Sequence, residues 1–274
     1  MSNFDIELVG KVGSMALINK EYNDINYNVI ARLSRELRPG MIWVTSGATE
    51  IGRLDFIKRN GYELEGEDSL VKTDYSAQGQ SILMSNYRQF VDSKYSLRQI
   101  LVEHNHFNNE VKKEYLKELL LRCPSQNAIP IINYNDPLST KEIIKLELSK
   151  MRTCTSPVHC LDNDETASQI ACLVKAKRLL ILTSVDGIYS DFSDKSSLVR
   201  EISGATIEEV LQNIDEYQKG CNGASRKGAN GAKAKLEYIK EPLKNGTEVF
   251  IANSIYRIAD ILNGTAPSTR IGVR

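Results

Sequence analysis

Six short apolar runs, most of them separated by helical patterns, constrain the fold of this chain most strongly. The runs are rich in β-branched residues and occupy residues 6–9, 41–44, 99–102, 128–132, 179–182 and 249–252. Continuous apolar strands that alternate with helices form a parallel sheet whose two faces are both covered. We therefore expect an α/β fold in which ligands bind at the carboxyl ends of the strands.

Helical patterns fill the intervals between these runs. Apolar side chains from Ile25 to Leu37 recur every four residues, and the pattern ends before Pro39. Further helices are expected over residues 76–91, 167–177, 207–214 and 232–239. A loop or lid is expected over residues 58–73 and an exposed loop over residues 190–199. No linker divides the chain, which favours a single domain over residues 1–274 with two lobes.

Charge and composition exclude several classes of partner. The 35 basic and 35 acidic side chains cancel, so no overall field attracts nucleic acid or an anionic membrane. No apolar run approaches the ~20 residues that span a bilayer, and the N-terminus lacks a signal pattern. The five cysteines form no C-x-x-C pair and the three histidines lack zinc-finger spacing. We expect a soluble intracellular protein with free thiols and no structural metal.

The first two apolar runs both end in turns of small residues. Val9-Gly-Lys-Val-Gly-Ser14 places Lys11 beside backbone N–H groups that can hold phosphate oxygens, although it is not a Walker A loop. An ordinary strand end with a solvated lysine is the alternative. Val44-Thr-Ser-Gly-Ala48 allows a ligand to approach the backbone, and it is also typical of a helix-capping loop.

Amide and carboxylate side chains cluster at two later points. Asn133 to Asp136 follow the fourth run, and Asp162 to Asp164 precede the helix expected from Ala167. Helix capping explains one acidic residue but less easily two clusters. Such groups suit an amino group, a metal ion or the orientation of lysines.

A last glycine turn, over residues 228–231, precedes the expected helix that carries Lys233 and Lys235 in its first turns. Cations at a helix N-terminus oppose the helix dipole, and a bound anion would remove that conflict. The alternative is an exposed basic helix end.

Together these features predict phosphoryl transfer to a carboxylate. The chain shows neither a Ser-His-Asp nor a Cys-His constellation. An alcohol acceptor usually needs a positioned base, whereas a carboxylic acid with a pKa near ~4.3 is already ionised at neutral pH. Two lysines and Mg²⁺ could then supply much of the catalysis, since two charges ~4 Å apart interact by on the order of 4 kcal/mol.

The motifs resemble those of the amino acid kinase family, and within it the glutamate 5-kinases. The resemblance runs from residue 6 to about residue 265, with the motifs in the family's order. The matching segments are Lys11-Val-Gly-Ser14, Val44 to Ala48 with Gly52-Arg53, Gly79-Gln-Ser81, Ile129 to Asn133 with Asn135-Asp136, Asp162-Asn-Asp164, Leu179 to Thr183 with Val185 to Tyr189, and Gly228 to Leu236. It implies a three-layer αβα sandwich with a largely parallel central sheet. An acceptor-side lobe would span about residues 1–165 and a nucleotide-side lobe about residues 166–274.

The resemblance also implies roles for individual residues. Lys11 and Lys235 would stabilise the transferring phosphoryl group, and Asp164 would orient both lysines. The residues implied to hold ATP and its phosphates are Lys11, Gly13, Ser14, Thr183, Ser184, Asp186, Gly231 and Lys235. Those implied to hold the acceptor are Ser46, Gly47, Ala48, Asp136 and Asn163. Mg²⁺ would be bound mainly through the ATP phosphates, with no direct protein ligand.

The implied activity is ATP-dependent phosphorylation of the side-chain carboxylate of L-glutamate, a step of proline biosynthesis, by a cytoplasmic dimer or tetramer. The chain stops near the end of the kinase domain, so no C-terminal PUA domain is expected. Tyr134 stands where the family usually has a glutamate, Ser184 replaces a common aspartate, and residues 141–159 form an insertion. Ala229 and Ala232 replace a threonine and a methionine. These departures keep open another acceptor, such as a nucleoside monophosphate, and a non-catalytic nucleotide-binding regulatory module.

Overall fold

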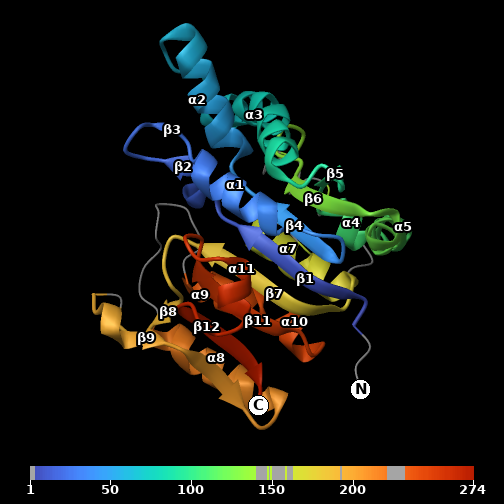
Figure 1. The fold of residues 1–274 in the computed structure, drawn as a ribbon, viewed down its shortest axis with the longest axis vertical. Coiled ribbons are helices and arrows are strands. Elements are labelled where there is room, and N and C mark those ends of the chain that lie inside the picture. The colour runs from blue at the N-terminus through green and yellow to red at the C-terminus, as the bar shows by residue number, and fades with distance from the viewer. Residues whose placement is uncertain are drawn as a thin grey trace.

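A single eight-stranded sheet forms the centre of the described part of the chain (Figure 1). The structure, a computed structural model, describes residues 4–139, 147, 149, 158, 163–191, 193–220 and 232–274. In spatial order the strands are β10 (Glu201–Gly204), β12 (Ser268–Val273), β11 (Glu248–Asn253), β7 (Ala176–Thr183), β1 (Ile6–Val12), β4 (Met41–Thr45), β6 (Ala128–Tyr134) and β5 (Ser96–Val102). Neighbouring strands are parallel except β11 and β12. The sheet is therefore largely parallel, as the sequence predicts.

Helices cover both faces of this sheet. Successive residues of a strand face opposite sides, so Leu8 and Val9 of β1 belong to two different apolar clusters. The helices that pack on the Leu8 side are α1 (Tyr27–Glu36), α2 (Ala48–Asn60), α3 (Asp68–Phe90) and α11 (Ile258–Leu262). Those on the Val9 side are α4 (Asn105–Asn108), α5 (Glu110–Arg122), α7 (Asn163–Leu173), α8 (Ile207–Gly220), α9 (Ala232–Tyr238) and α10 (Lys240–Lys244). These layers confirm the predicted αβα sandwich.

Small elements complete the described chain. Two short hairpins pair β2 (Ile18–Asn19) with β3 (Asp24–Ile25) and β8 (Ile188–Tyr189) with β9 (Leu198–Val199). The 3₁₀ turns are η1 (Ser14–Ala16), η2 (Pro124–Gln126) and η3 (Lys195–Ser197). Strands from both sides of residue 165 join the same sheet, and the division into two functional lobes stays a prediction. Within the described stretches, no helix combines the length and apolar character needed to cross a membrane.

The expected loop or lid over residues 58–73 is wrong. Helix α2 continues to Asn60 and α3 begins at Asp68, so the connection is confined to residues 61–67. The outer parts of α2 and α3 pack mainly on one another and carry polar side chains, which removes the apolar stripe that a sheet-packed helix would show. The edge strand β10, its neighbour β12 and helix α5 are also absent from the sequence expectation.

Glycines set the close contact between α2 and α3. A Cβ added at Gly79 would collide with the carbonyl oxygen of Ala48, and one added at Gly52 would collide with that of Tyr75. The two helix backbones therefore touch without intervening side chains. Beneath them the buried Trp43 ring of β4 lies against Gly10 of β1 and donates its indole N–H to the Tyr87 hydroxyl at 3.0 Å.

Replacing Gly79 by alanine is expected to lower the free energy of unfolding by about 3 kcal/mol. The new methyl group would collide with the backbone of α2, which cannot move aside as the end of a flexible side chain can. Urea unfolding measures this loss. Ser85→Ala on the exposed side of the same helix is the control, with a change within about 0.5 kcal/mol. Equal stability of the two variants would contradict the close helix contact.

Candidate functional site

The carboxyl ends of the central strands meet at one edge of the sheet. Val12, the last residue of β1, lies opposite Thr45 of β4 and Leu182 of β7. On the outer side, β6 ends at Tyr134 next to β4, and β11 ends at Asn253 opposite Thr183. Loops that leave these strands therefore gather in one place, as a parallel sheet requires of its ligand-binding edge.

Two lysines converge on one buried carboxylate at this edge. Lys11 Nζ of β1 lies 2.6 Å from Asp164 Oδ1, and Lys235 Nζ of α9 lies 2.9 Å from Asp164 Oδ2. The Asp164 side chain is 6% exposed, against 9% for Lys11 and 20% for Lys235. Asp164 lies in the first turn of α7, which begins at Asn163, four residues before the start expected at Ala167. Three elements far apart in sequence thus share one ion-pair cluster.

The cluster carries more positive than negative charge. Burial would raise the pKa of the Asp164 carboxyl, but the charges and hydrogen bonds of Lys11 and Lys235 outweigh it and hold this pKa at about 2. Among the described residues neither ammonium group has a second ion-pair partner. One carboxylate faces two ammonium groups, so the site is suited to binding a further anion.

The glycine turn after β1 lies beside this cluster. Gly13 donates its N–H to the Leu182 carbonyl at 3.2 Å, and a Cβ there would lie 3.6 Å from Lys11 Nζ. Gly13 therefore lies within ordinary contact distance of the ammonium group. Ser14 begins the η1 turn and is half-buried. Their roles in holding phosphate stay predictions.

The side-chain amide of Asn163 connects the start of α7 to the turn after β4 and to β6. Asn163 Nδ2 donates to Ser46 Oγ at 3.0 Å and to Asn133 Oδ1 at 3.3 Å. Gly47 has a φ of 104°, a conformation that favours glycine, and is the N-cap residue of α2. The Ala48 residue is buried in the core, and its carbonyl packs against Gly79 of α3, so its role in holding the acceptor stays a prediction.

Asp136 follows β6 in the loop beside these residues. Burial raises the pKa of its carboxyl to about 6, from an ordinary value of 3.8. No cation among the described residues offsets this effect, so the carboxyl is suited to a positively charged ligand group.

Thr183, Ser184 and Asp186 lie at the ends of β7 and β11. Thr183 Oγ1 accepts from the Val185 N–H at 2.9 Å, which shapes the turn. Asn253 Nδ2 donates to Asp186 Oδ1 at 3.1 Å and to the Ser184 carbonyl at 3.3 Å. Sequence reasoning missed Asn253, although it is the first residue after the predicted strand over 249–252 and belongs to the same edge.

Asn133 and Gln80 also take part in the site without an assigned role in the sequence. Asn133 Nδ2 donates to Gln80 Oε1 at 3.3 Å, which links β6 to α3. Both residues lie in segments that match the family's motifs, and this match is the sequence signal that could have identified them. Asp162, Gly231, the glycine turn over 228–230 and most of the 141–159 insertion lie outside the described residues.

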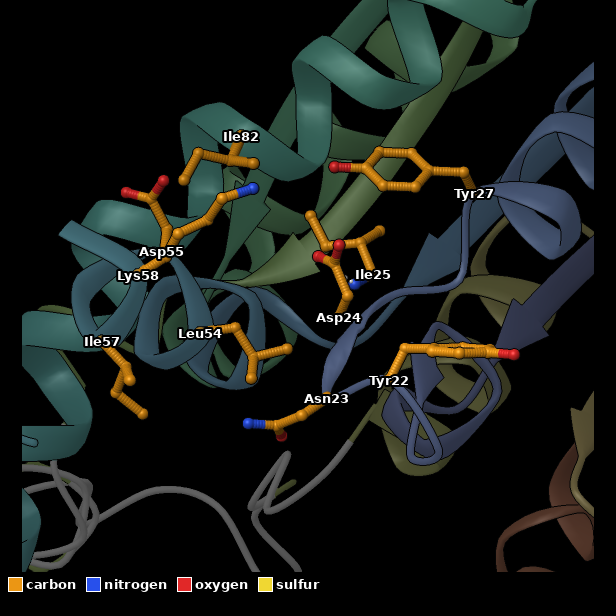
Figure 2. Close-up of a pocket in the computed structure, with 10 residues that line it drawn as sticks. All are labelled: Tyr22, Asn23, Asp24, Ile25, Tyr27, Leu54, Asp55, Ile57, Lys58 and Ile82. Carbon is orange, nitrogen blue, oxygen red and sulfur yellow. Dashed lines mark hydrogen bonds between the residues drawn. The ribbon is translucent and has the colours of Figure 1, made fainter. Parts of the chain in front are cut away.

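A separate cleft of about 350 Å³ lies between the β2–β3 hairpin and helices α2 and α3 (Figure 2). Tyr22 and Asp24 line its hairpin side, and Lys58 and Ile82 line its helical side. None of the predicted site residues lines this cleft. Across the described stretches, no group of three His, Cys, Asp or Glu side chains gathers to hold a metal ion.

Asp164→Asn is expected to lower the free energy of unfolding at pH 7 by about 3 kcal/mol, because it leaves buried ammonium groups without a counter-charge. The folded-state pKa of about 2 lies below the unfolded value near 3.8, so the carboxylate stabilises the wild-type fold above pH 4. About 2 kcal/mol of that advantage is expected to disappear as the pH falls from 4 towards 2.

Urea unfolding between pH 7 and pH 2 measures both effects. Asp215→Asn, which removes a carboxylate from the exposed surface of α8, is the control and should change little. A difference between wild type and Asp164→Asn that stays constant down to pH 2 would contradict the assignment.

Comparison with known proteins places this geometry in a family. The Amino acid kinase family matches residues 8–253. The chain is 27% identical over 254 residues to a glutamate 5-kinase of Streptococcus suis (strain 05ZYH33), covering 90% of this chain and 64% of that protein. It therefore spans less than two thirds of that relative. It is also 27% identical over 269 residues to a glutamate 5-kinase of Clostridium perfringens (strain 13 / Type A), covering 94% of this chain and 91% of that protein.

The fold is similar to that of a solved structure. Carbamate kinase from Giardia lamblia bound to AMP-PNP matches with a TM-score of 0.64 and 16% identity, covering 100% of both chains. This likeness supports the three-layer architecture independently of the sequence motifs. Because the family match extends over most of the described sheet and both lysine-bearing elements, the chain belongs to the amino acid kinase family.

Proposed function

We propose that this protein transfers the γ-phosphoryl group of ATP to the side-chain carboxylate of L-glutamate, forming L-glutamyl 5-phosphate. The observation that carries the proposal is the buried cluster in which two ammonium groups share the Asp164 carboxylate. Its excess positive charge lies where the carboxyl ends of β1 and β7 meet, the edge at which a parallel α/β sheet binds ligands.

The two lysines supply electrostatic stabilisation. Charge develops on the oxygens of the transferring phosphoryl group, and preorganised cations lower the barrier most when they need not reorganise. Asp164 holds Lys11 and Lys235 in place, and each ammonium group keeps further N–H donors for phosphate oxygens. A charge ~4 Å away contributes on the order of 4 kcal/mol at intermediate dielectric.

A carboxylate acceptor fits this arrangement because it needs no general base. The acceptor is ionised at neutral pH, so alignment and charge neutralisation are sufficient. Asp136 and the amide oxygen of Asn163 suit the ammonium group of an amino acid, and the Ser46 hydroxyl suits its carboxylate. The likeness to glutamate 5-kinases supports L-glutamate as that amino acid and proline biosynthesis as its context.

ATP is the proposed donor, in keeping with the AMP-PNP of the carbamate kinase neighbour. Mg²⁺ carried on the ATP phosphates fits the site, since Asp164 already forms ion pairs with two lysines. Bound in that way, the ion would neutralise phosphate charge. A homo-oligomer remains an expectation from the resemblance.

The test is ADP release from Mg-ATP with L-glutamate, L-aspartate, N-acetylglutamate, carbamate, UMP or no acceptor. We expect release with L-glutamate and trapping of the product as a hydroxamate, because acyl phosphates react with hydroxylamine. Release with another acceptor alone would keep phosphoryl transfer and overturn the glutamate assignment. ATP binding without any turnover would favour a regulatory module.

Lys235→Met is expected to lower kcat by about 100-fold, because it removes one of the two cations at the transferring group. Steady-state kinetics at saturating substrates measures this loss. Lys233→Met is the matched control: it lies on the same helix, is exposed and forms no ion pair with Asp164. Equal losses of kcat in the two variants would contradict a specific role of Lys235 and assign the loss to the change in net charge.

The specificity constant for L-glutamate is expected to rise as the pH increases through about 6. Burial raises the pKa of Asp136 to about 6, so the carboxylate that attracts the ammonium group forms only above this pH. Asp136→Asn should lower kcat/KM by about 30-fold above pH 7 and flatten the profile. An unchanged profile in that variant would assign the pH dependence to another group.

A further inference from the structure

We propose that Gln80 is a positioning residue that, together with the Tyr134 backbone, holds the direction of a chain of side-chain amides ending at Asn163. Through this chain the acceptor pocket presents a hydrogen-bond acceptor, the Asn163 Oδ1 atom, to the substrate. The inference rests on the proposed function, because it concerns which acceptors that site prefers. It concerns substrates that carry an ammonium group next to a carboxylate.

The chain of amides crosses from α3 to α7. Gln80 of α3 is 7% exposed and donates its Nε2 to the Tyr134 carbonyl at 3.3 Å. Asn133 Nδ2 donates to Gln80 Oε1 at 3.3 Å, and Asn163 Nδ2 donates to Asn133 Oδ1 at 3.3 Å. Gln80 and Asn133 thus each use the NH₂ group on one neighbour and the oxygen on the next.

The backbone of Tyr134 fixes the direction of this chain. A side-chain amide can be placed either way round, and its hydrogen-bond partners decide which is correct. The Tyr134 carbonyl can only accept, so Gln80 must turn its NH₂ group towards it. The Tyr134 N–H can only donate, and it donates to Asn133 Oδ1 at 2.8 Å. Two amides are therefore oriented by groups that cannot reverse their polarity.

The consequence appears at Asn163. Its NH₂ group is used by Asn133 and by Ser46 Oγ at 3.0 Å, while its Oδ1 is buried without a hydrogen-bond partner among the described residues. A buried carbonyl oxygen without a donor costs about 1–3 kcal/mol. An ammonium group on the substrate would supply that donor. Because Ser46 accepts from Asn163, its hydroxyl proton is free to donate to the substrate carboxylate.

Packing of α3 against α2 holds Gln80 within hydrogen-bond distance of its partners. The neighbouring Gly79 touches the Ala48 carbonyl, so α3 cannot shift relative to α2 without a collision. Gln99 Nε2 of β5 lies 3.5 Å from Gln80 Oε1 and adds a second donor to that oxygen. Both contacts favour the orientation in which Gln80 Oε1 accepts.

The test compares Gln80→Met with wild type in direct binding of L-glutamate and of glutarate, which lacks the amino group. Calorimetry should show that wild type prefers L-glutamate and that Gln80→Met loses about tenfold of this preference, with its affinity for ATP within twofold. In kinetics the KM for L-glutamate should rise about tenfold, with kcat within twofold. Methionine keeps the length of the side chain and removes both polar ends.

Asn86→Leu is the matched control. Asn86 lies on the same helix, is also 7% exposed and donates within its own helix to the Ile82 carbonyl at 2.9 Å. It should leave the preference unchanged. If Gln80→Met does not fold, Gln80→Leu is the second variant, since leucine also removes both the donor to the Tyr134 carbonyl and the acceptor for Asn133. It should show the same loss.

The outcomes separate the two proposals. Wild type that prefers L-glutamate in binding but never releases ADP would overturn the proposed function and leave the Gln80 variants to test the amide chain. Wild type that binds L-glutamate and glutarate equally, or neither, would overturn the amide chain. So would a Gln80→Met protein that keeps the full preference.

Discussion

The ion pairs of Asp164 with Lys11 and Lys235 are the interaction on which the site depends. They connect the end of β1 to the first turn of α7 and to α9. More than a hundred residues of chain separate β1 from each of these two helices. The carboxylate is buried between two ammonium groups, so the loss of this carboxylate would leave an uncompensated buried charge. The excess positive charge that remains is a property of the folded chain, because the three side chains meet only when the sheet is complete.

The two sides of the site use different physics. The proposed phosphate side is built from charges, and the proposed acceptor side is built mainly from neutral amides whose hydrogen bonds have a direction. Ion pairs tolerate small displacements because the Coulomb energy falls slowly with distance. A hydrogen bond between two amides is lost when one amide group rotates and exchanges its donor and acceptor ends. Asn163 and Asp164 are adjacent in the first turn of α7, so the two systems are joined by a single peptide bond.

The sequence predicts the core of the sheet well because β1, β4, β6, β7 and β11 are continuous apolar runs. It misses β10 and β12, whose residues Glu201 and Arg270 pair with one another at a partly exposed edge and break the apolar pattern. It also predicts a loop where α2 and α3 extend beyond the sheet, because helices that pack on each other need no stripe facing a core. The motif residues Lys11, Asp164 and Lys235 come together as the resemblance implies. The directions of the amides at Gln80 and Asn133 depend on the Tyr134 backbone, and no sequence pattern records them.

The backbone contact between Gly79 and Ala48 has a mechanical consequence. Helix α3 has 23 residues and is about 35 Å long, and together with α2 it extends well away from the sheet (Figure 1). Because the two backbones touch directly, we expect the pair to move as one rigid unit about the contact beside Gln80 and the turn that carries Ser46. A small rotation of the helix pair, caused by a contact near Tyr62 in the connection between α2 and α3, would therefore displace the amide chain and the turn after β4 together.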